Sequence, residues 1–174
     1  ITSLGAVSDL VNTVHGYGGL VYHDIIKKRH AEKASEAGVD GLILVAAGAG
    51  GHAGALSPLA LINEIKSFFK KTILLSGCIS NGRDIASALQ MGADLAYMGT
   101  RFINVEESMA DPEYQQMIIS SRAEDIVYTA AVSGVNANFL RPSLEAMGIT
   151  EELWSQTKKI DFGNELDAAK SEAQ

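Results

Sequence analysis

The sequence predicts an α/β fold with a parallel sheet, built from repeated strand–helix units of the kind found in (β/α)8 barrels. Short, continuous apolar runs end in glycine, as expected for parallel strands that are covered on both faces. Amphipathic helical patterns lie between these runs. A weak internal repeat, Gly38-Val39-Asp40-Gly41 and Gly92-Ala93-Asp94-Leu95, recurs after 54 residues, which corresponds to two units of a length plausible for such a barrel.

The apolar runs predict four strands, and the segments between them predict three helices. The strands are expected at 19–23, 41–46, 72–76 and 95–98. The first helix is expected at 27–37, with Ala31, Ala34 and Ala37 on its buried face. The second is expected to begin at Ser57 and Pro58, and its buried face is Leu59, Ile62, Ile65 and Phe69. The third is expected to be capped by Asn81, and its buried face is Ile85, Ala88 and Leu89.

After about residue 105 the glycine-ended runs stop. We expect a helix at 106–122, an extended segment at 126–129, a turn at 133–134, short helices at 144–147 and 151–157, and a frayed helix at 164–174. We therefore divide the chain into a barrel part, 1–104, and a helical C-terminal extension, 105–174, that packs on it.

Composition excludes several classes of protein. The net charge of −7 lacks the positive field of a nucleic-acid binder, and no apolar stretch reaches the ~18 residues of a membrane span. The single cysteine, Cys78, excludes an internal disulfide framework and a cysteine-cluster metal site. We expect a cytoplasmic protein without a bound metal.

The glycine-rich segment at 46–54 is the first candidate for chemistry. It follows a predicted buried strand, and loops at the carboxyl ends of parallel strands form active sites. Within it, His52 can accept or donate a proton near neutral pH. The alternative is a flexible turn with an incidental histidine. A dinucleotide fingerprint also fits Gly48, Gly50 and Ala53, but the next strand does not end in the acidic residue that this motif needs.

Two further loops, 76–82 and 98–102, follow the third and fourth strands and favour a phosphate site. Gly77, Cys78, Gly99 and Thr100 would supply backbone N–H donors, although each loop alone also fits an ordinary turn. Cys78 is either a nucleophile or a small residue tolerated in a turn.

The other histidines give weaker signals. His15 and His30 are expected on helix surfaces. His23 and Asp24 end the first strand, where they either face the site or make structural hydrogen bonds.

Five segments of the sequence, in their order and spacing, resemble the nitronate monooxygenase family, formerly called 2-nitropropane dioxygenase. These segments are 38–41, 49–54, 77–79, 92–94 and 98–102. The resemblance implies an FMN-dependent TIM barrel with His52 as the catalytic base near the flavin ring. It also implies cofactor-binding residues, which are Gly50 and Gly51 near the flavin and Gly77, Cys78, Met98, Gly99 and Thr100 along the ribityl phosphate.

The chain also departs from the family pattern. Family members often carry Gln and Glu where this chain has Val45 and Gly48, and the usual Gly-Gly-Ile is Gly77-Cys78-Ile79. The family's first half-barrel has no counterpart in this sequence. We therefore expect the chain to form strands five to eight of the barrel and the C-terminal extension. The expected partner of this half is a second copy of the chain or the missing N-terminal half.

The leading functional expectation is an FMN-dependent oxidoreductase that converts alkyl nitronates or nitroalkanes, with O2, to a carbonyl compound and nitrite. The first alternative is an NAD(P)H-dependent flavin reductase that acts on quinones or enoyl thioesters, because the flavin-binding loops say little about the electron acceptor. The second alternative is a non-catalytic fragment.

Overall fold

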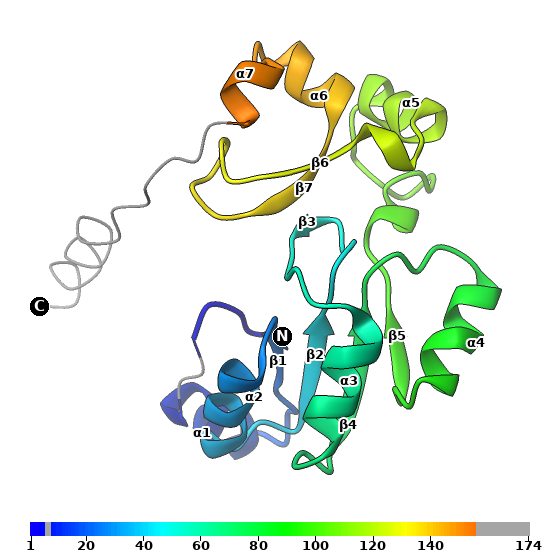
Figure 1. The fold of residues 1–174 in the computed structure, drawn as a ribbon. Coiled ribbons are helices and arrows are strands. Elements are labelled where there is room, and N and C mark those ends of the chain that lie inside the picture. The colour runs from blue at the N-terminus through cyan, green and yellow to red at the C-terminus, as the bar shows by residue number, and fades with distance from the viewer. Residues whose placement is uncertain (6–7, 156–174) are drawn as a thin grey trace, which may run out of the picture.

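The computed structural model describes residues 1–5 and 8–155, and its main feature is a parallel sheet of four strands (Figure 1). The sheet has the order β1-β2-β4-β5, and each neighbouring pair is parallel. The strands are β1 (Tyr22–Ile25), β2 (Gly41–Val45), β4 (Thr72–Ser76) and β5 (Leu95–Tyr97). The four strands expected from the apolar runs are thus confirmed.

The first strand begins three residues later than expected, because Gly18 and Gly19 belong to the end of helix α1 (Ser8–Gly16). The N–H of Gly18 donates to the carbonyl of His15, and the N–H of Gly19 donates to that of Val14. Gly18 has a φ of 81°, the left-handed conformation that commonly ends a helix. The sequence 19–23 is therefore split between a helix terminus and a strand.

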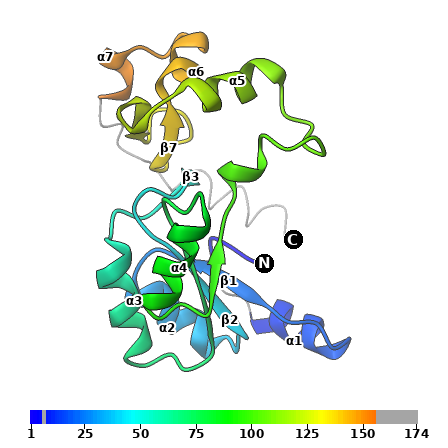
Figure 2. The same ribbon diagram turned by 90° about the vertical axis from the view of Figure 1, so that its right-hand side faces the viewer.

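Three helices connect the strands and cover one face of the sheet (Figure 2). They are α2 (Lys28–Glu36), α3 (Pro58–Lys66) and α4 (Gly82–Gln90). Asn81 caps α4 as expected, since its side-chain oxygen accepts from the N–H groups of Arg83 and Asp84 at 2.9 and 3.2 Å. Ser57 and Pro58 begin α3 as expected, although the Ser57 side chain makes no capping hydrogen bond.

The buried faces of the helices are mostly as expected. Ala31 and Ala34 of α2, Ile62 and Ile65 of α3, and Ala88 of α4 are fully buried. Leu59 and Leu89 are wrong predictions, with 59% and 47% of their surface exposed. The buried stripe of α3 instead runs through Leu61, which turns Leu59 toward the flank of the helix.

The internal repeat has a structural explanation in its two aspartates. The carboxylate of Asp40 accepts the N–H of Val21 at 2.7 Å, and that of Asp94 accepts the N–H of Ile73 at 2.8 Å. In return, the N–H of each aspartate donates to the carbonyl of the same residue at 2.8 Å. Each aspartate thus joins the amino end of one strand to its neighbour.

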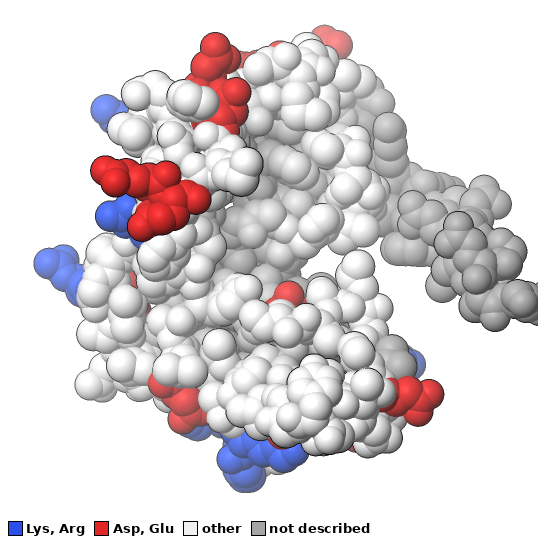
Figure 3. All heavy atoms as spheres, turned by 180° about the vertical axis from the view of Figure 1, so that it is seen from behind, with Lys and Arg blue, Asp and Glu red and all other residues white. Residues whose placement is uncertain are grey.

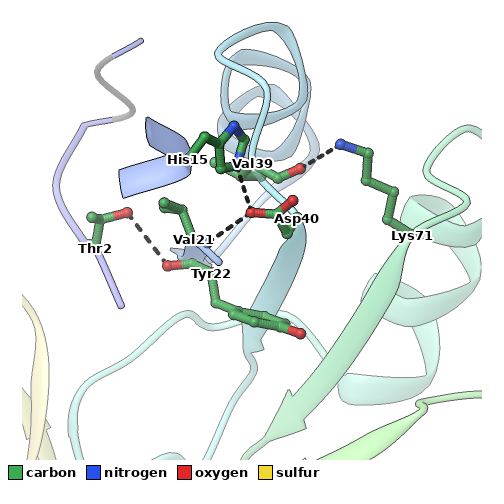
Figure 4. Close-up of polar contacts among 7 residues, drawn as sticks. All are labelled: Thr2, His15, Val21, Tyr22, Val39, Asp40 and Lys71. Atoms are coloured by element: carbon green, nitrogen blue, oxygen red, sulfur yellow. Dashed lines mark hydrogen bonds and ion pairs between the residues drawn. The ribbon is translucent and has the colours of Figure 1, made fainter. Parts of the chain in front are cut away.

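Asp40 also accepts a hydrogen bond from Nε2 of His15 at 2.8 Å, and the Lys71 ammonium donates to the adjacent carbonyl of Val39 (Figure 4). The hydrogen bond from Val21, followed by that from His15, lowers the pKa of the Asp40 carboxyl. This contribution to stability is present while the carboxylate is ionised, and it is lost as the pH falls through the lowered pKa.

A second sheet of three antiparallel strands has the order β3-β7-β6. Its strands are β3 (Gly51–His52), β6 (Ile126–Thr129) and β7 (Ala137–Leu140). The extended segment at 126–129 is confirmed as β6, whereas β3 and β7 were not predicted. Because β3 comes from the glycine-rich loop, its pairing with β7 connects the barrel part to the C-terminal part.

The C-terminal part is not purely helical, contrary to expectation, because β6 and β7 form a hairpin within it. Its helices are α5 (Pro112–Ser120), α6 (Arg141–Ala146) and α7 (Glu151–Trp154), with short 3-10 turns η1 (Thr100–Phe102) and η2 (Ala123–Asp125). Helix α5 is shorter than expected because Asp111 caps it, accepting the N–H of Glu113 at 2.7 Å ahead of Pro112. The helix expected at 164–174 lies outside the described residues, and the boundary at 104 stays a prediction.

In the described part of the chain, no helix combines the length and the apolar character that crossing a membrane requires.

Candidate active site

A cavity, the larger of the pair that flanks β3, lies where the carboxyl ends of β2, β4 and β5 meet β7 and the segment after α5. Its volume is ≈ 960 Å³. All seven residues predicted to bind the cofactor line it, namely Gly50, Gly51, Gly77, Cys78, Met98, Gly99 and Thr100. The structure therefore brings together two loops and a glycine-rich segment that the sequence could only place at strand ends.

Three glycines of this cavity, Gly48, Gly50 and Gly77, are required by close packing between the loops. A Cβ atom on Gly48, whose φ is 83°, would overlap the thiol of Cys78, and one on Gly50 would overlap the hydroxyl of Thr100. A Cβ atom on Gly77, whose φ is 136°, would lie 2.8 Å from the carbonyl oxygen of Ala47. Larger residues would either separate the loops or fill the cavity, so the glycines keep the backbone itself at the cavity wall.

Cys78 lies in a turn that its own backbone ties to the glycine-rich segment. Its backbone N–H donates to the carbonyl of Gly48 at 3.2 Å, so this N–H is engaged within the protein and is not a free phosphate donor. Its thiol lies 3.7 Å from the same carbonyl oxygen. Cys78 also has a φ of 54°, which is unfavourable for a residue with a side chain.

This strain gives a prediction for Cys78→Gly. Glycine adopts a positive φ without steric cost, so we expect the variant to fold with unchanged or higher stability, by up to about 1 kcal/mol, and with unchanged turnover. Thermal unfolding and steady-state kinetics are the measurements. Cys78→Ala is the matched control, because it removes the thiol and keeps the strained Cβ. A large loss of turnover in both variants would show that the thiol takes part in the reaction.

The smaller cavity, of ≈ 400 Å³, contains the side chain of His52. Successive residues of a strand point to opposite faces, so Gly51 of β3 faces the larger cavity and His52 faces the smaller one. The expected base and the expected cofactor residues thus lie on the two sides of β3.

The hydrogen bonds of His52 indicate which ring nitrogen is free. Nε2 of His52 lies 3.2 Å from the hydroxyl oxygen of Ser133, and that hydroxyl donates its only hydrogen to the carbonyl of Val135 at 3.1 Å. Ser133 must therefore accept from His52, which assigns the proton of the neutral ring to Nε2. Nδ1 then retains the lone pair that a base needs.

His23 and Asp24, at the end of β1, also line the smaller cavity. His23 is buried, and its Nδ1 lies 2.7 Å from the hydroxyl of Thr2, so it makes a structural hydrogen bond. Burial, together with the nearby His30, lowers the pKa of His23. Oδ1 of Asp24 is buried and has no hydrogen-bond partner among the described residues, and burial raises the pKa of this carboxyl.

The other two histidines differ from each other. His15 is exposed as expected. His30, also expected on the surface, is partly buried and lines the smaller cavity, and burial followed by the charges of Lys27, Lys33 and Arg29 lowers its pKa.

Several residues of the larger cavity were not found from the sequence. Arg122 is the single charged side chain among the residues that line it, and Asn138 donates to the carbonyl of Ala49 at 2.7 Å. Tyr97, Tyr114 and Phe139 add aromatic surface. Most of these residues come from the C-terminal part, whose approach to the glycine-rich loop depends on the unpredicted pairing of β3 with β7, and no local signal marks them.

Charged side chains are unevenly distributed over the surface. On the face shown in Figure 3, Lys, Arg, Asp and Glu lie mainly at the periphery. Within residues 1–5 and 8–155 no group of three or more His, Cys, Asp or Glu side chains is arranged to hold a metal ion.

Comparison with known proteins identifies the family. The family model for nitronate monooxygenase matches residues 2–164. A putative monooxygenase of Mycobacterium tuberculosis is 31% identical over 134 residues, which cover 76% of this chain and 36% of the relative. A nitronate monooxygenase of Paraburkholderia phytofirmans is 31% identical over 153 residues, which cover 81% of this chain and 42% of the relative. The chain thus spans less than half the length of these two relatives.

Solved structures give the same fold. FabK of Thermotoga maritima is 27% identical, with a TM-score of 0.72 over 86% of this chain and 50% of that one. Nitroalkane oxidase of Streptomyces ansochromogenes is 22% identical, with a TM-score of 0.71 over 79% of this chain and 42% of that one.

Both of these structures are TIM barrels, so the parallel strands β1, β2, β4 and β5 correspond to the C-terminal half of a (β/α)8 barrel, as predicted. The family model covers nearly the whole chain. The chain therefore belongs to the nitronate monooxygenase family.

Proposed function

We propose that this chain carries the flavin-binding half of an FMN-dependent oxidoreductase that uses O2 to oxidise alkyl nitronates to a carbonyl compound and nitrite. The observation that carries the proposal is the larger cavity, which gathers all seven predicted cofactor residues at the carboxyl ends of parallel strands. This edge of the sheet is where enzymes with this fold bind their ligands.

The residues of the cavity fit FMN. Its volume of ≈ 960 Å³ is at the upper end of the range of about 300–1,000 Å³ for ligand pockets. Gly50 and Gly51 let the backbone approach a flat ring, and Gly77, Met98, Gly99 and Thr100 would lie along the ribityl phosphate. Cys78 would shape this loop rather than donate to the phosphate.

Charge supports the same assignment. Among the described residues that line the larger cavity, Arg122 is the only charged one, so it would offer a cation to a phosphate dianion without an opposing carboxylate among them. FMN, when bound, supplies the chemistry of taking electrons from the substrate and passing them to O2.

His52 is the proposed base, and in β3 it directly follows Gly51, one of the proposed flavin-binding residues. In the neutral ring, Nδ1 would accept the proton from the carbon next to the nitro group of a neutral nitroalkane. Ser133 would keep the ring oriented through Nε2. A nitronate has already lost this proton, so His52 would only orient it.

Nitrite release tests the proposal. The flavin-loaded protein is mixed with propionate 3-nitronate or a nitroalkane under air, and we expect nitrite to form with uptake of O2. Absence of nitrite from a preparation in which flavin is fully bound would contradict the assignment.

An NAD(P)H-dependent flavin reductase is the second candidate. The structure of FabK of Thermotoga maritima matches 86% of this chain. In addition, Val45 and Gly48 offer no polar side chain where the family often has Gln and Glu. Anaerobic mixing discriminates between the two candidates. Rapid bleaching of the flavin by NADH or NADPH favours the reductase, whereas bleaching by nitronate alone favours the monooxygenase.

A further inference from the structure

The hairpin of β6 and β7 contacts the glycine-rich segment through side-chain hydrogen bonds at two points. Nδ2 of Asn138 donates to the carbonyl of Ala49 at 2.7 Å, and the hydroxyl of Tyr128 donates to the carbonyl of Ala53 at 3.0 Å. Both acceptors belong to buried residues. The residues between them, 50–52, are the proposed flavin-binding glycines and the proposed base.

Strand pairing explains why these two side chains reach the same segment. Asn138 is the partner of Gly51 in the β3–β7 pair and the partner of Tyr128 in the β6–β7 pair. Directly paired residues of neighbouring strands point to the same face of a sheet, so the side chains of Asn138 and Tyr128 lie on one face. Their acceptors come two residues before and two residues after Gly51. The hairpin therefore holds the segment on both sides of Gly51.

The backbone alone holds this segment weakly. Strand β3 has two residues, and the N–H of Ala53 donates to the carbonyl of Asn136 at 3.5 Å, which is long for a hydrogen bond. Four of the seven residues at 48–54 are glycine, so this part of the chain loses more conformational freedom on folding than an ordinary loop does. Side-chain bonds from the hairpin are therefore needed to restrict its conformations.

Tyr128 acts at the end of the segment that carries the proposed base. Ala53 directly follows His52, so a hydrogen bond to its carbonyl limits the movement of the His52 backbone. The ring of His52 lies 3.2 Å from the hydroxyl oxygen of Ser133, in the connection between β6 and β7. The hairpin thus contacts both the backbone next to His52 and its imidazole.

We propose that Tyr128 is a positioning residue for proton abstraction, because its hydroxyl holds the carbonyl of Ala53 and thereby keeps the imidazole of His52 in place. This inference rests on the proposed function, since it assigns Tyr128 to the step in which His52 takes a proton from a neutral nitroalkane. Tyr128 is not among the described residues that line the two cavities, so it acts through His52. A small displacement of a catalytic group is enough to slow such a step.

The first test compares the turnover of a neutral nitroalkane with that of its preformed nitronate in flavin-loaded Tyr128→Phe. This variant removes only the hydroxyl, at a side chain that is 43% exposed, so we expect it to fold. The kcat with nitroalkane should fall roughly three- to tenfold, the usual net contribution of one hydrogen bond, and the kcat with nitronate should change little. Both KM values should stay close to those of the wild type, because the cavities keep their lining residues.

Tyr17→Phe is the matched control, because it removes a hydroxyl from a tyrosine that is 74% exposed and lies outside both cavities. It should leave both rates unchanged. Equal losses for nitroalkane and nitronate in Tyr128→Phe would indicate a general loss of folded protein and would overturn the positioning role.

The second test does not depend on turnover. Hydrogen exchange followed by mass spectrometry measures how readily the backbone amides of 48–54 open. We expect Tyr128→Phe to speed exchange in this segment roughly three- to tenfold and to leave helix α3 unchanged, whereas Tyr17→Phe should change neither. Unchanged exchange in the segment, or an equal rise in α3, would show that the Tyr128 hydroxyl does not hold the segment locally.

These tests separate the two proposals. If the wild type forms no nitrite but Tyr128→Phe speeds exchange in 48–54, the nitronate assignment fails and the hold of Tyr128 on the segment stands. If nitrite forms and Tyr128→Phe keeps the wild-type kcat with nitroalkane, the role of Tyr128 fails and the nitronate assignment stands.

Discussion

Replacement of His52 by asparagine is expected to lower the turnover of a neutral nitroalkane by roughly 10²–10⁴-fold, the usual contribution of general-base catalysis. Asparagine has no nitrogen that can take the proton. The turnover of a preformed nitronate should fall much less, because this substrate has already lost its proton. Steady-state kinetics with the nitroalkane and its nitronate measure this difference directly.

The same variant should keep its flavin. His52 faces the smaller cavity, and the glycines that would hold FMN line the larger one, so the substitution leaves the cofactor site untouched.

Ser133→Ala is the companion variant, because it removes the partner of Nε2 and keeps the imidazole. We expect a loss of about tenfold or less, since one exposed hydrogen bond orients the ring. Equal losses for nitroalkane and nitronate in His52→Asn would indicate binding or electrostatics instead of proton transfer. Full activity with both substrates would make His52 an incidental residue of the glycine-rich loop.

The second large effect is expected from Gly99→Asp, which should abolish flavin retention. Gly99 has a φ of −117°, which any residue can adopt, and a Cβ atom there meets no atom within 4 Å. The substitution therefore adds a carboxylate to the cavity wall without a clash inside the protein. Beside a dianionic phosphate this charge should weaken FMN binding by roughly 10²-fold or more.

Gly99→Asn is the matched control for shape, because it adds the same number of heavy atoms without the charge. Titration of the apoprotein with FMN and with riboflavin measures the effect, and riboflavin, which lacks the phosphate, should be far less sensitive to the new carboxylate. Arg122→Gln should weaken FMN in the same selective way, because it removes the only charge of the larger cavity. Unchanged FMN affinity in a folded Gly99→Asp variant would show that the phosphate lies elsewhere.

The sequence predicted the parallel strands because each one is a continuous apolar run, and a strand buried on both faces needs such a run. The glycine-rich segment could be placed at the carboxyl edge for the same reason. Strand β3 could not be predicted, because Gly51 and His52 are too few to show an alternation. Strand β7, Ala137–Leu140, has mixed polarity and is defined by its long-range partners, β3 and β6.

Some residues of the candidate site could likewise be predicted from the sequence, and others could not. Residues such as Gly77 and Thr100 follow strands directly, and their place in the larger cavity follows from topology. Arg122 and Tyr114 reach that cavity only through the fold of the C-terminal part. Asp24 was left with two interpretations, and the structure places it among the residues that line the smaller cavity.

The two aspartates of the internal repeat both act at the amino edge of the sheet, opposite the edge that carries the candidate site. Asp40 and Asp94 hold neighbouring strands in register at their amino ends, and the loops of the candidate site leave the same strands at their carboxyl ends. The alignment of the strands therefore depends on residues at the edge of the sheet opposite the candidate site. The loops are consequently free to change in length and composition, so a new substrate preference can arise, or be engineered, without shifting any strand against its neighbour.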